Sequence, residues 1–294
     1  MSVTTLGSAP AYAPGRSRPG GRAYWGALML APYLLVFLGL VLYPVAYGLY
    51  LGLDTQSYRK LFQDPIFYRT AVNTILFLTI AVNLKLAIAL ALSGFFVVDR
   101  AWVRVLLVLF ILPWAVPSIP TILSFRVMLN PENGMINQQL FRLFGIFDGP
   151  PWLTDPRLAF ASAIMVHIWK SLPFWTLILV TGRLAIAKDL YEAASVDGAS
   201  RWQQFRHITW PSLANLYLTS TILSMIWTLG DFNSVYLLTG GGPADQTQVL
   251  ATLGIRYMRN NSLDLGIASI IVAMPLVLPL VFVMVKRLSK GGEA

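Results

Sequence analysis

Long stretches with almost no charged residue alternate with short polar segments along this chain of 294 residues. Two of the stretches contain one lysine each, Lys85 and Lys170, and the others contain no lysine, arginine, aspartate or glutamate. The stretches are 23–53, 71–98, 105–125, 158–182, 208–230 and 265–285. Because about 20 helical residues cross a hydrocarbon core of about 30 Å, each stretch is predicted to be a transmembrane helix.

The predicted fold class is therefore an all-α membrane protein with six transmembrane helices. Residues 1–22 are rich in Pro, Gly, Ser, Ala and Arg without an apolar period, which predicts a disordered cytoplasmic tail. Residues 23–294 are expected to form one transmembrane domain, with a polar cytoplasmic loop at 187–207. The expected helices span about 24–50, 69–98, 103–128, 158–184, 208–230 and 264–288.

Composition and charge support a multi-pass protein of the cell inner membrane. Hydrophobic residues make up 56% of the chain and charged residues only 12%, too few charges for a soluble domain. With both termini in the cytoplasm, the inner segments carry twelve basic residues against five acidic ones, and the outer segments eight against eight. The excess positive charge behind the net +9 thus lies in the predicted inner segments and indicates the orientation of the chain in the membrane. No basic patch is interleaved with exposed aromatic residues, so a nucleic-acid partner is not expected.

The longest run of mixed charge, residues 189–207, lies between two of the membrane-length stretches. Asp189 and Glu192 have capping-box spacing, as do Ser200 and Gln203, which predicts two short helices. Gly198 lies between them, where a chain that leaves a helix often needs a left-handed residue. The two alanines after Glu192 would let another protein's backbone approach closely. The segment is therefore predicted to dock a soluble partner.

The motif Glu192-Ala193-Ala194, Asp197-Gly198 and Trp210-Pro211 resembles the EAA loop of the permease subunits of binding-protein-dependent ABC importers. The family usually has Leu before the closing proline, where this chain has Trp210. The alternative is an ordinary polar loop that contains two helix caps. The presence of the whole motif between membrane helices favours a loop that couples the permease to an ATPase. The resemblance implies these ATPase-coupling residues: Glu192, Ala193, Ala194, Asp197, Gly198 and Pro211.

The third stretch contains three prolines within eight residues, Pro113, Pro117 and Pro120. Proline lacks a backbone donor and clashes with the preceding turn, so this helix is predicted to break or kink. Freed carbonyls at membrane depth must be buried in protein or face a wet cavity. Two interpretations remain open: a bent wall of a solute path, or a packing kink against neighbouring helices.

Polar side chains share one face of the fourth and fifth predicted helices, at positions i, i+3, i+4 and i+7. Ionisable groups at this depth normally face the bundle interior or water. Such a face beside aromatic rings suits a sugar, whose hydroxyls need donors and acceptors. The alternative is that His167 and Lys170 are structural and are satisfied by a neighbouring subunit. The predicted substrate-path residues are His167, Lys170, Ser171, Phe174, Ser224, Trp227 and Thr228.

The segments 130–137, 152–155, 169–174 and 238–243 together resemble the maltose-type permeases of carbohydrate importers, over roughly residues 24–288. That resemblance places the sugar-contacting positions of the branch on the same seven residues, although several side chains differ. It also implies a second homologous permease, a dimer of ATPase subunits and an external solute-binding protein. ATP and Mg would be bound by the ATPase, so no cofactor is expected on this chain.

Lys85 occupies the middle of the second predicted helix, and no carboxylate of this chain is expected deep enough in the membrane to neutralise it. It could snorkel to the interface, pair with an acid on a partner permease, or meet an acidic solute. We expect a contact with a partner subunit or with the solute cavity.

No catalytic constellation is visible in the sequence. Gly240-Gly241-Gly242-Pro243 lacks the lysine of a phosphate-binding loop, and no His, Asp or Glu cluster has metal-ligand spacing. The chain is therefore predicted to be no enzyme but the permease of an ATP-driven importer that moves a sugar by alternating access. The alternatives are a polyol or glycerol-phosphate importer, a secondary transporter, which would need carboxylates within its helices, and a membrane scaffold, which would need no docking loop.

Overall fold

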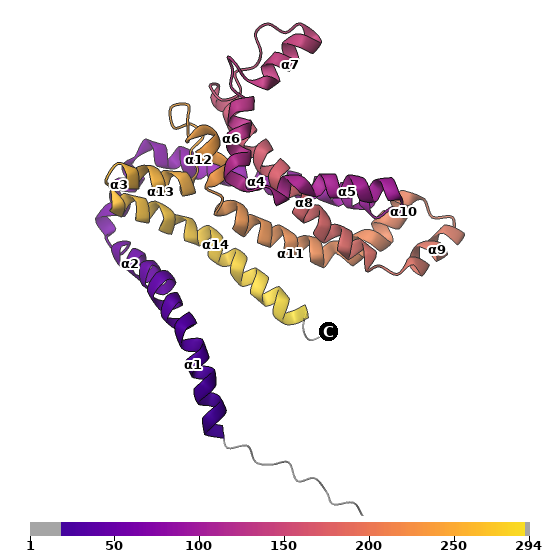
Figure 1. The fold of residues 1–294 in the computed structure, drawn as a ribbon, viewed down its shortest axis with the longest axis horizontal. Helices are drawn as coiled ribbons and strands as arrows, with labels where there is room; N and C mark the ends of the chain where they lie inside the picture. The colour runs from indigo at the N-terminus through magenta and orange to yellow at the C-terminus, as the bar shows by residue number, and fades with distance from the viewer. Residues whose placement is uncertain (1–18, 292–294) are drawn as a thin grey trace, which may run out of the picture. The chain divides into compact units, whose positions relative to one another are not determined.

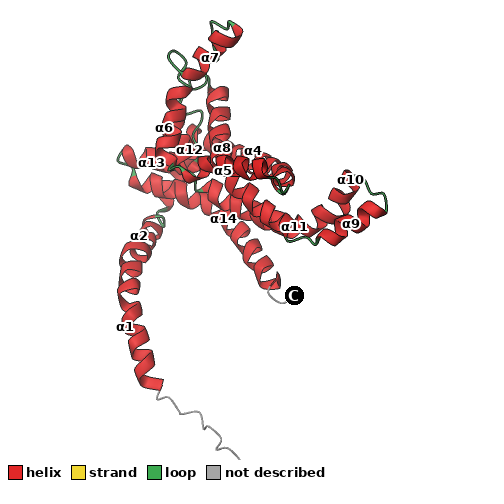
Figure 2. Ribbon diagram, turned by 45° about the vertical axis from the view of Figure 1, so that its right-hand side comes forward, coloured by secondary structure: helices red, strands yellow, loops and turns green. Residues whose placement is uncertain are grey.

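The computed structural model describes residues 19–291, and within that range the chain forms helices joined by loops, with no strand (Figure 2). The predicted all-α class is confirmed. The chain divides after Leu51 into two compact units, Met1–Leu51 and Gly52–Ala294. Most of the predicted tail, residues 1–18, lies outside the described residues, and helix already begins at Pro19, inside the range predicted for that tail.

The first unit is a single apolar helical segment. It consists of α1 (Pro19–Phe37), the wide π-helical turn η1 (Leu38–Leu42) and α2 (Tyr43–Leu51). The Tyr43 N–H donates to the Leu38 carbonyl, one residue further back than in an α-helix. Pro44 follows at once, and its ring would clash with the carbonyl four residues before it in a regular helix.

The second unit holds the remaining helices. Its first half contains α3 (Thr55–Gln63), α4 (Pro65–Phe96), α5 (Ala101–Ala115), α6 (Ser118–Met128) and α7 (Met135–Phe144). Next come α8 (Pro156–Leu184), α9 (Lys188–Val196), α10 (Arg201–Gln204), the π-helical turn η2 (Phe205–Thr209) and α11 (Trp210–Leu229). The chain ends with α12 (Asn233–Thr239), α13 (Leu250–Arg259) and α14 (Leu263–Gly291).

Helices lie in all six ranges that the apolar stretches predict. Among residues 19–291, four helical segments are each long and apolar enough to cross a membrane. Two bent pairs bring the number to six if each pair is one span: α5 with α6, bent by 94°, and α10–α11 with α12, bent by 42°. The sharper bend lies at Val116-Pro117, so the break predicted from the prolines is confirmed.

The core of the second unit lies where α4 packs along α8, with α5 and α11 against the same pair. Small residues allow the two long helices to approach, and fully buried alanines on both sides include Ala81 and Ala89 on α4 and Ala159 and Ala163 on α8. Within this bundle the fully buried Trp175 packs with Leu86 and Leu179.

Within the second unit, α9 and α10 lie at one end of the long helices, and α12 and α13 lie near the other (Figure 1). The segments between the apolar stretches at 54–68, 130–157 and 231–264 are themselves partly helical, since they contain α3, α7, α12 and α13. The unit therefore presents two separate structured ends, with the polar face of α8 between them.

Candidate functional site

Most of the predicted substrate-path residues line one cavity of about 280 Å³ inside the second unit. From α8 it receives His167, Lys170 and Ser171, and from α11 it receives Trp227 and Thr228. The helical spacing that placed these side chains on two faces therefore brings the faces together. Lys85 of α4 and the turn after α11 complete the polar lining.

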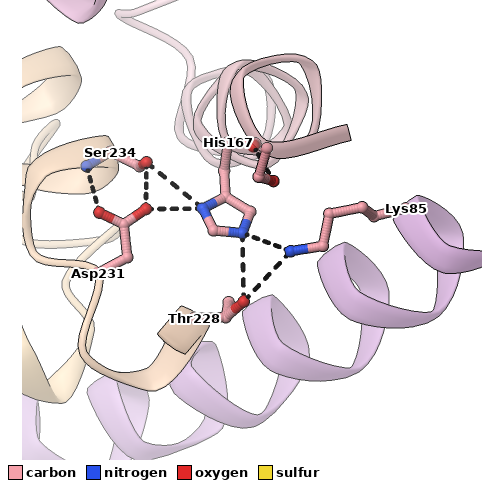
Figure 3. Close-up of polar contacts among 6 residues, drawn as sticks. Lys85, His167, Thr228, Asp231 and Ser234 are labelled. Atoms are coloured by element: carbon pink, nitrogen blue, oxygen red, sulfur yellow. Dashed lines mark hydrogen bonds and ion pairs between the residues drawn. The ribbon is translucent and has the colours of Figure 1, made fainter. Parts of the chain in front are cut away.

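A chain of ionic and hydrogen-bonding groups crosses this cavity (Figure 3). His167 Nδ1 lies 2.6 Å from Asp231 Oδ2, and His167 Nε2 lies 3.2 Å from Lys85 Nζ and 3.2 Å from Thr228 Oγ1. Because Nδ1 faces a carboxylate and Nε2 faces an ammonium, we assign the neutral tautomer that donates from Nδ1 and accepts at Nε2. Lys85 and Asp231 thus neutralise one another through the imidazole.

Asp231 is held in place by the start of α12. The Ser234 N–H donates to its Oδ1 at 3.2 Å, and the Ser234 hydroxyl donates to its Oδ2. The expectation that Lys85 has no carboxylate of its own chain is therefore wrong. Lys85 is only 1% exposed, and an ammonium buried to that degree is costly unless it is paired. The alternative in which a neighbouring subunit satisfies His167 is not needed, because Asp231 does so.

Lys170 binds the broken end of α5. Its ammonium donates to the carbonyls of Pro113 at 2.7 Å, Trp114 at 3.1 Å and Val116. These carbonyls are the ones that a helix end and a proline break leave without intrahelical donors. Lys170 thus caps α5 and also lines the cavity. The proline break is therefore both a packing feature of the bundle and part of the cavity wall.

Two predicted residues do not line the cavity. Phe174 instead stacks on Trp114, with ring centroids 5.5 Å apart, and packs on Trp227 at 5.2 Å. Ser224 is fully buried, and its hydroxyl has no hydrogen-bond partner within the described part of the chain. Trp227 remains 52% exposed and lines the cavity, and Phe174 packs against its ring.

The polar loop forms the two short helices that its spacing predicts, α9 and α10. The capping box of Ser200 is confirmed, since its Oγ accepts from the Gln203 N–H at 3.3 Å and its N–H donates to Gln203 Oε1 at 2.7 Å. The box predicted at Asp189 is wrong, because α9 begins at Lys188 with Ala187 at its cap and Asp189 lies in the first turn. The left-handed conformation of Gly198 is confirmed by its φ of +76°.

The predicted ATPase-coupling residues lie on the surface of this loop. Ala194 and Asp197 line a small hollow with side chains of α10 and η2. Pro211 follows η2 in the same way as Pro44 follows η1, one residue beyond a wide turn. The exposed members are Glu192, Ala193, Asp197, Gly198 and Pro211, and Ala194 is half-buried.

Between residues 19 and 291, no three His, Cys, Asp or Glu side chains lie close enough together to hold a metal ion. The site is a polar, partly aromatic cavity inside a helical bundle, with a structured polar loop at one end of the bundle. Fold and site together define a polytopic membrane transport protein.

The comparison with known families makes this class specific. Residues 83–291 match the family described as binding-protein-dependent transport system inner membrane component, and the chain belongs to that family. It is therefore a multi-pass permease of the inner membrane that works with a binding protein, and it is not the ATPase of the transporter. Asp231 places a carboxylate inside the bundle, so a lack of such carboxylates does not exclude a secondary transporter. The family assignment excludes one instead.

Several characterised proteins are similar to this chain. The trehalose/maltose transport system permease protein MalF of Thermococcus litoralis is 32% identical over 88% of this chain and 91% of its own. The sulfoquinovosyl glycerol transport system permease protein SmoG of Agrobacterium fabrum is 34% identical over 82% of each chain. A chain of a bacterial alginate ABC transporter, solved with an alginate pentasaccharide-bound periplasmic protein, superposes with a TM-score of 0.79 at 22% identity, covering 90% of this chain and 93% of its own. That likeness establishes the fold.

Proposed function

We propose that this permease moves a carbohydrate from an external solute-binding protein into the cytoplasm, powered by a separate ATPase. The single observation that carries the proposal is the cavity itself, which joins hydroxyl, imidazole and ammonium groups to the exposed ring of Trp227. Sugars need hydrogen-bonding groups along their rims and an apolar surface for their ring faces. The relatives named for trehalose, maltose and sulfoquinovosyl glycerol support a carbohydrate.

The mechanism is alternating access with both termini in the cytoplasm, as the distribution of basic residues favours. Closure of the ATPase dimer on ATP moves α9 and α10, and the long helices then open the cavity outward to receive solute. Hydrolysis of ATP resets them. The ends at α12 and α13 then face the binding protein, and a second homologous permease completes the path.

The surface of the loop supports docking on an ATPase. Its apolar side chains Leu190, Val196 and Trp202 are 52%, 88% and 66% exposed. Exposed apolar residues gathered on one short segment mark an interaction surface more often than a solvated one. Glu192 and Asp197 add charge beside them, and Ala193 adds a position that a partner's backbone can approach.

The substrate class is tested first on the solute-binding protein that works with this permease. Its melting temperature is measured with maltose, trehalose, glycerol, glycerol 3-phosphate and an alginate oligosaccharide. A rise with a saccharide and none with glycerol or glycerol 3-phosphate supports the proposal, since a ligand that binds only the folded state raises its stability. A rise with glycerol 3-phosphate alone would assign the transporter to polyol phosphates instead.

The path is tested on the assembled transporter in vesicles with Trp227→Ala. Uptake of the identified sugar is expected to fall about tenfold or more, on the scale of losing one stacked aromatic contact, while the ATPase stays bound. Trp169→Ala is the matched control, because Trp169 is similarly exposed on α8 but packs on Phe125 and does not line the cavity. Equal uptake by the two variants would show that Trp227 is a packing residue.

A further inference from the structure

Arg183 in the last turn of α8 contacts two other segments at once. Its Nε donates to Ser93 Oγ at 2.7 Å, and one terminal nitrogen donates to the Leu90 carbonyl at 3.1 Å, both on α4. Its guanidinium carbon lies 5.8 Å from the centroid of the ring of Phe205, and Phe205 is the first residue of η2. The cavity does not include Arg183, so its position needs another explanation.

The contact with α4 is built for an arginine. Ser93 is fully buried and itself donates to the Leu90 carbonyl at 2.7 Å, so the hydroxyl and the guanidinium share one acceptor. A Cβ at Gly94 would lie 3.5 Å from the guanidinium, in ordinary van der Waals contact, so the plane lies directly against the α4 backbone. A planar fork of donors fits two acceptors on one helix in a way that an ammonium on a flexible stem does not.

On its other side, Arg183 contacts η2, which is hydrogen-bonded to the α9 helix that carries Glu192. The hydroxyls of Thr209, at the end of η2, and Tyr191, on α9, lie 2.8 Å apart. Gln204, which precedes η2, donates from its side-chain amide to Ser195 Oγ on α9 at 2.9 Å. α9 is therefore tied to η2, and the ring at the start of η2 lies against the guanidinium.

The α4 contact lies close to the cavity along a single rigid element. Ser93 follows Lys85 by two helical turns, about 12 Å at ~1.5 Å per residue. A continuous set of contacts thus links α9 to the helix that carries Lys85, through η2, Arg183 and α4. A contact that is shared by the two moving parts can bias both of them.

We propose that Arg183 is the positioning residue that transmits movement of α9 and η2 to α4, and through α4 to the cavity. This inference rests on the proposed alternating-access function. The role requires both halves of the contact: the two bonds to α4 and the face that receives the Phe205 ring. A residue that only fastened the ends of α4 and α8 would stabilise the bundle without linking nucleotide state to the cavity.

The test uses the assembled transporter with its partner permease and ATPase, in lipid nanodiscs. The chain contains no cysteine, so a Ser171→Cys reporter in the cavity is the one thiol that this subunit contributes. For this test, the partner subunits are expressed as variants without cysteine. The rate of N-ethylmaleimide labelling is measured with and without ATP plus vanadate, beside the ATP hydrolysis rate. This readout needs no knowledge of the solute.

In the parent reporter, trapping the ATPase is expected to change the labelling rate at least about fivefold, the low end of typical coupling between sites. Adding Arg183→Gln should reduce that change to about twofold or less while ATP hydrolysis continues. Phe205→Leu should act in the same direction, and it leaves both bonds to α4 intact, so it covers the case in which Arg183→Gln fails to assemble. Arg104→Gln is the matched control, because Arg104 forms only an exposed ion pair with Asp99.

Two outcomes separate the inference from the proposal beneath it. If labelling in the parent reporter does not respond to nucleotide, the cavity is not part of the transport path and the proposed function fails. If the parent responds and both the Arg183 and the Phe205 variants respond equally well, Arg183 is only a structural fastener and the inference is overturned.

Discussion

The cavity and the α9–α10 loop differ in how far their side chains find partners within this chain. In the cavity, Lys85, His167 and Asp231 pair with one another, and Lys170 finds its acceptors on α5. On the loop, Val196 and Trp202 point largely into the surroundings. The cavity is thus complete in its ionic contacts within one chain, whereas the loop presents apolar surface that a second protein can cover.

The difference follows from where each region lies. A charge inside the bundle is costly unless its partner is fixed beside it, so folding of this chain has to supply that partner. The loop carries no such penalty, and its sequence is free to serve another subunit. Substitutions of the charged cavity residues should therefore act on stability first, and substitutions in the loop should act on coupling.

The largest expected effect is that of Asp231→Asn. Removing one partner of a buried ion pair strands the other charge, which costs about 3–5 kcal/mol. Thermal unfolding of the purified transporter should show a marked loss of stability. Asp245→Asn is the control, because Asp245 pairs with Arg256 at 2.8 Å while both remain about one-third exposed, where a pair contributes about 0–1 kcal/mol. Equal losses would contradict the pairing in Figure 3.

Lys170→Met should have the next largest effect. It removes the donor shared by the carbonyls of Pro113 and Trp114. An unsatisfied acceptor costs about 1–3 kcal/mol where it is cut off from water, and less where it is exposed, as at Trp114. The same unfolding measurement checks it, with Lys60→Met on exposed α3 as the control. A variant as stable as the control would mean that water already serves these carbonyls.

Gly198→Val acts on the loop. A β-branched residue forced to a φ of +76° costs about 1–2 kcal/mol, so the turn between α9 and α10 should change shape while the bundle stays folded. Uptake should fall although the ATPase still hydrolyses ATP. Gly48→Ala is the control, because Gly48 has open space beside it and no left-handed φ. Normal uptake by the valine variant would count against the coupling role of the loop.

Ser200→Ala should have the smallest effect. Loss of an N-cap costs about 1 kcal/mol, which corresponds to roughly fivefold faster hydrogen exchange of the Gln203 amide. Exchange within α8 should not change, because the cap belongs to a local helix. Ser212→Ala provides the comparison, since the Ser212 hydroxyl in α11 donates to the Ile208 carbonyl in the preceding turn η2 and caps no helix start. An unchanged rate at Gln203 would mean that the capping box does not hold α10.

The membrane-length helices could be predicted from the sequence because a long apolar run has few other stable states in a bilayer. The break near Pro117 could be predicted for a similar reason, since proline removes a donor wherever the helix lies. Asp231 could not. It follows the fifth apolar stretch by one residue, and only the turn into α12 carries it back to His167.

The helix caps of the loop also show that sequence spacing does not fix the local structure. Asp189 and Ser200 have the same spacing to a glutamate or glutamine, yet only Ser200 caps a helix. The cap is the residue whose backbone is extended, and at the first helix that residue is Ala187, with ψ of 130°. Spacing alone does not report which residue that is.

The wide turn η2 sets the rotational register of everything that follows it. A π turn holds one more residue than an α turn, and each residue of an α-helix is rotated by about 100° from the last. If the turn tightened after Pro211→Ala, α11 would present a different stripe to its neighbours, and Thr228 would swing away from the imidazole it now meets. The Pro211 ring next to the loop thereby influences which side chains of α11 face the cavity some five turns later.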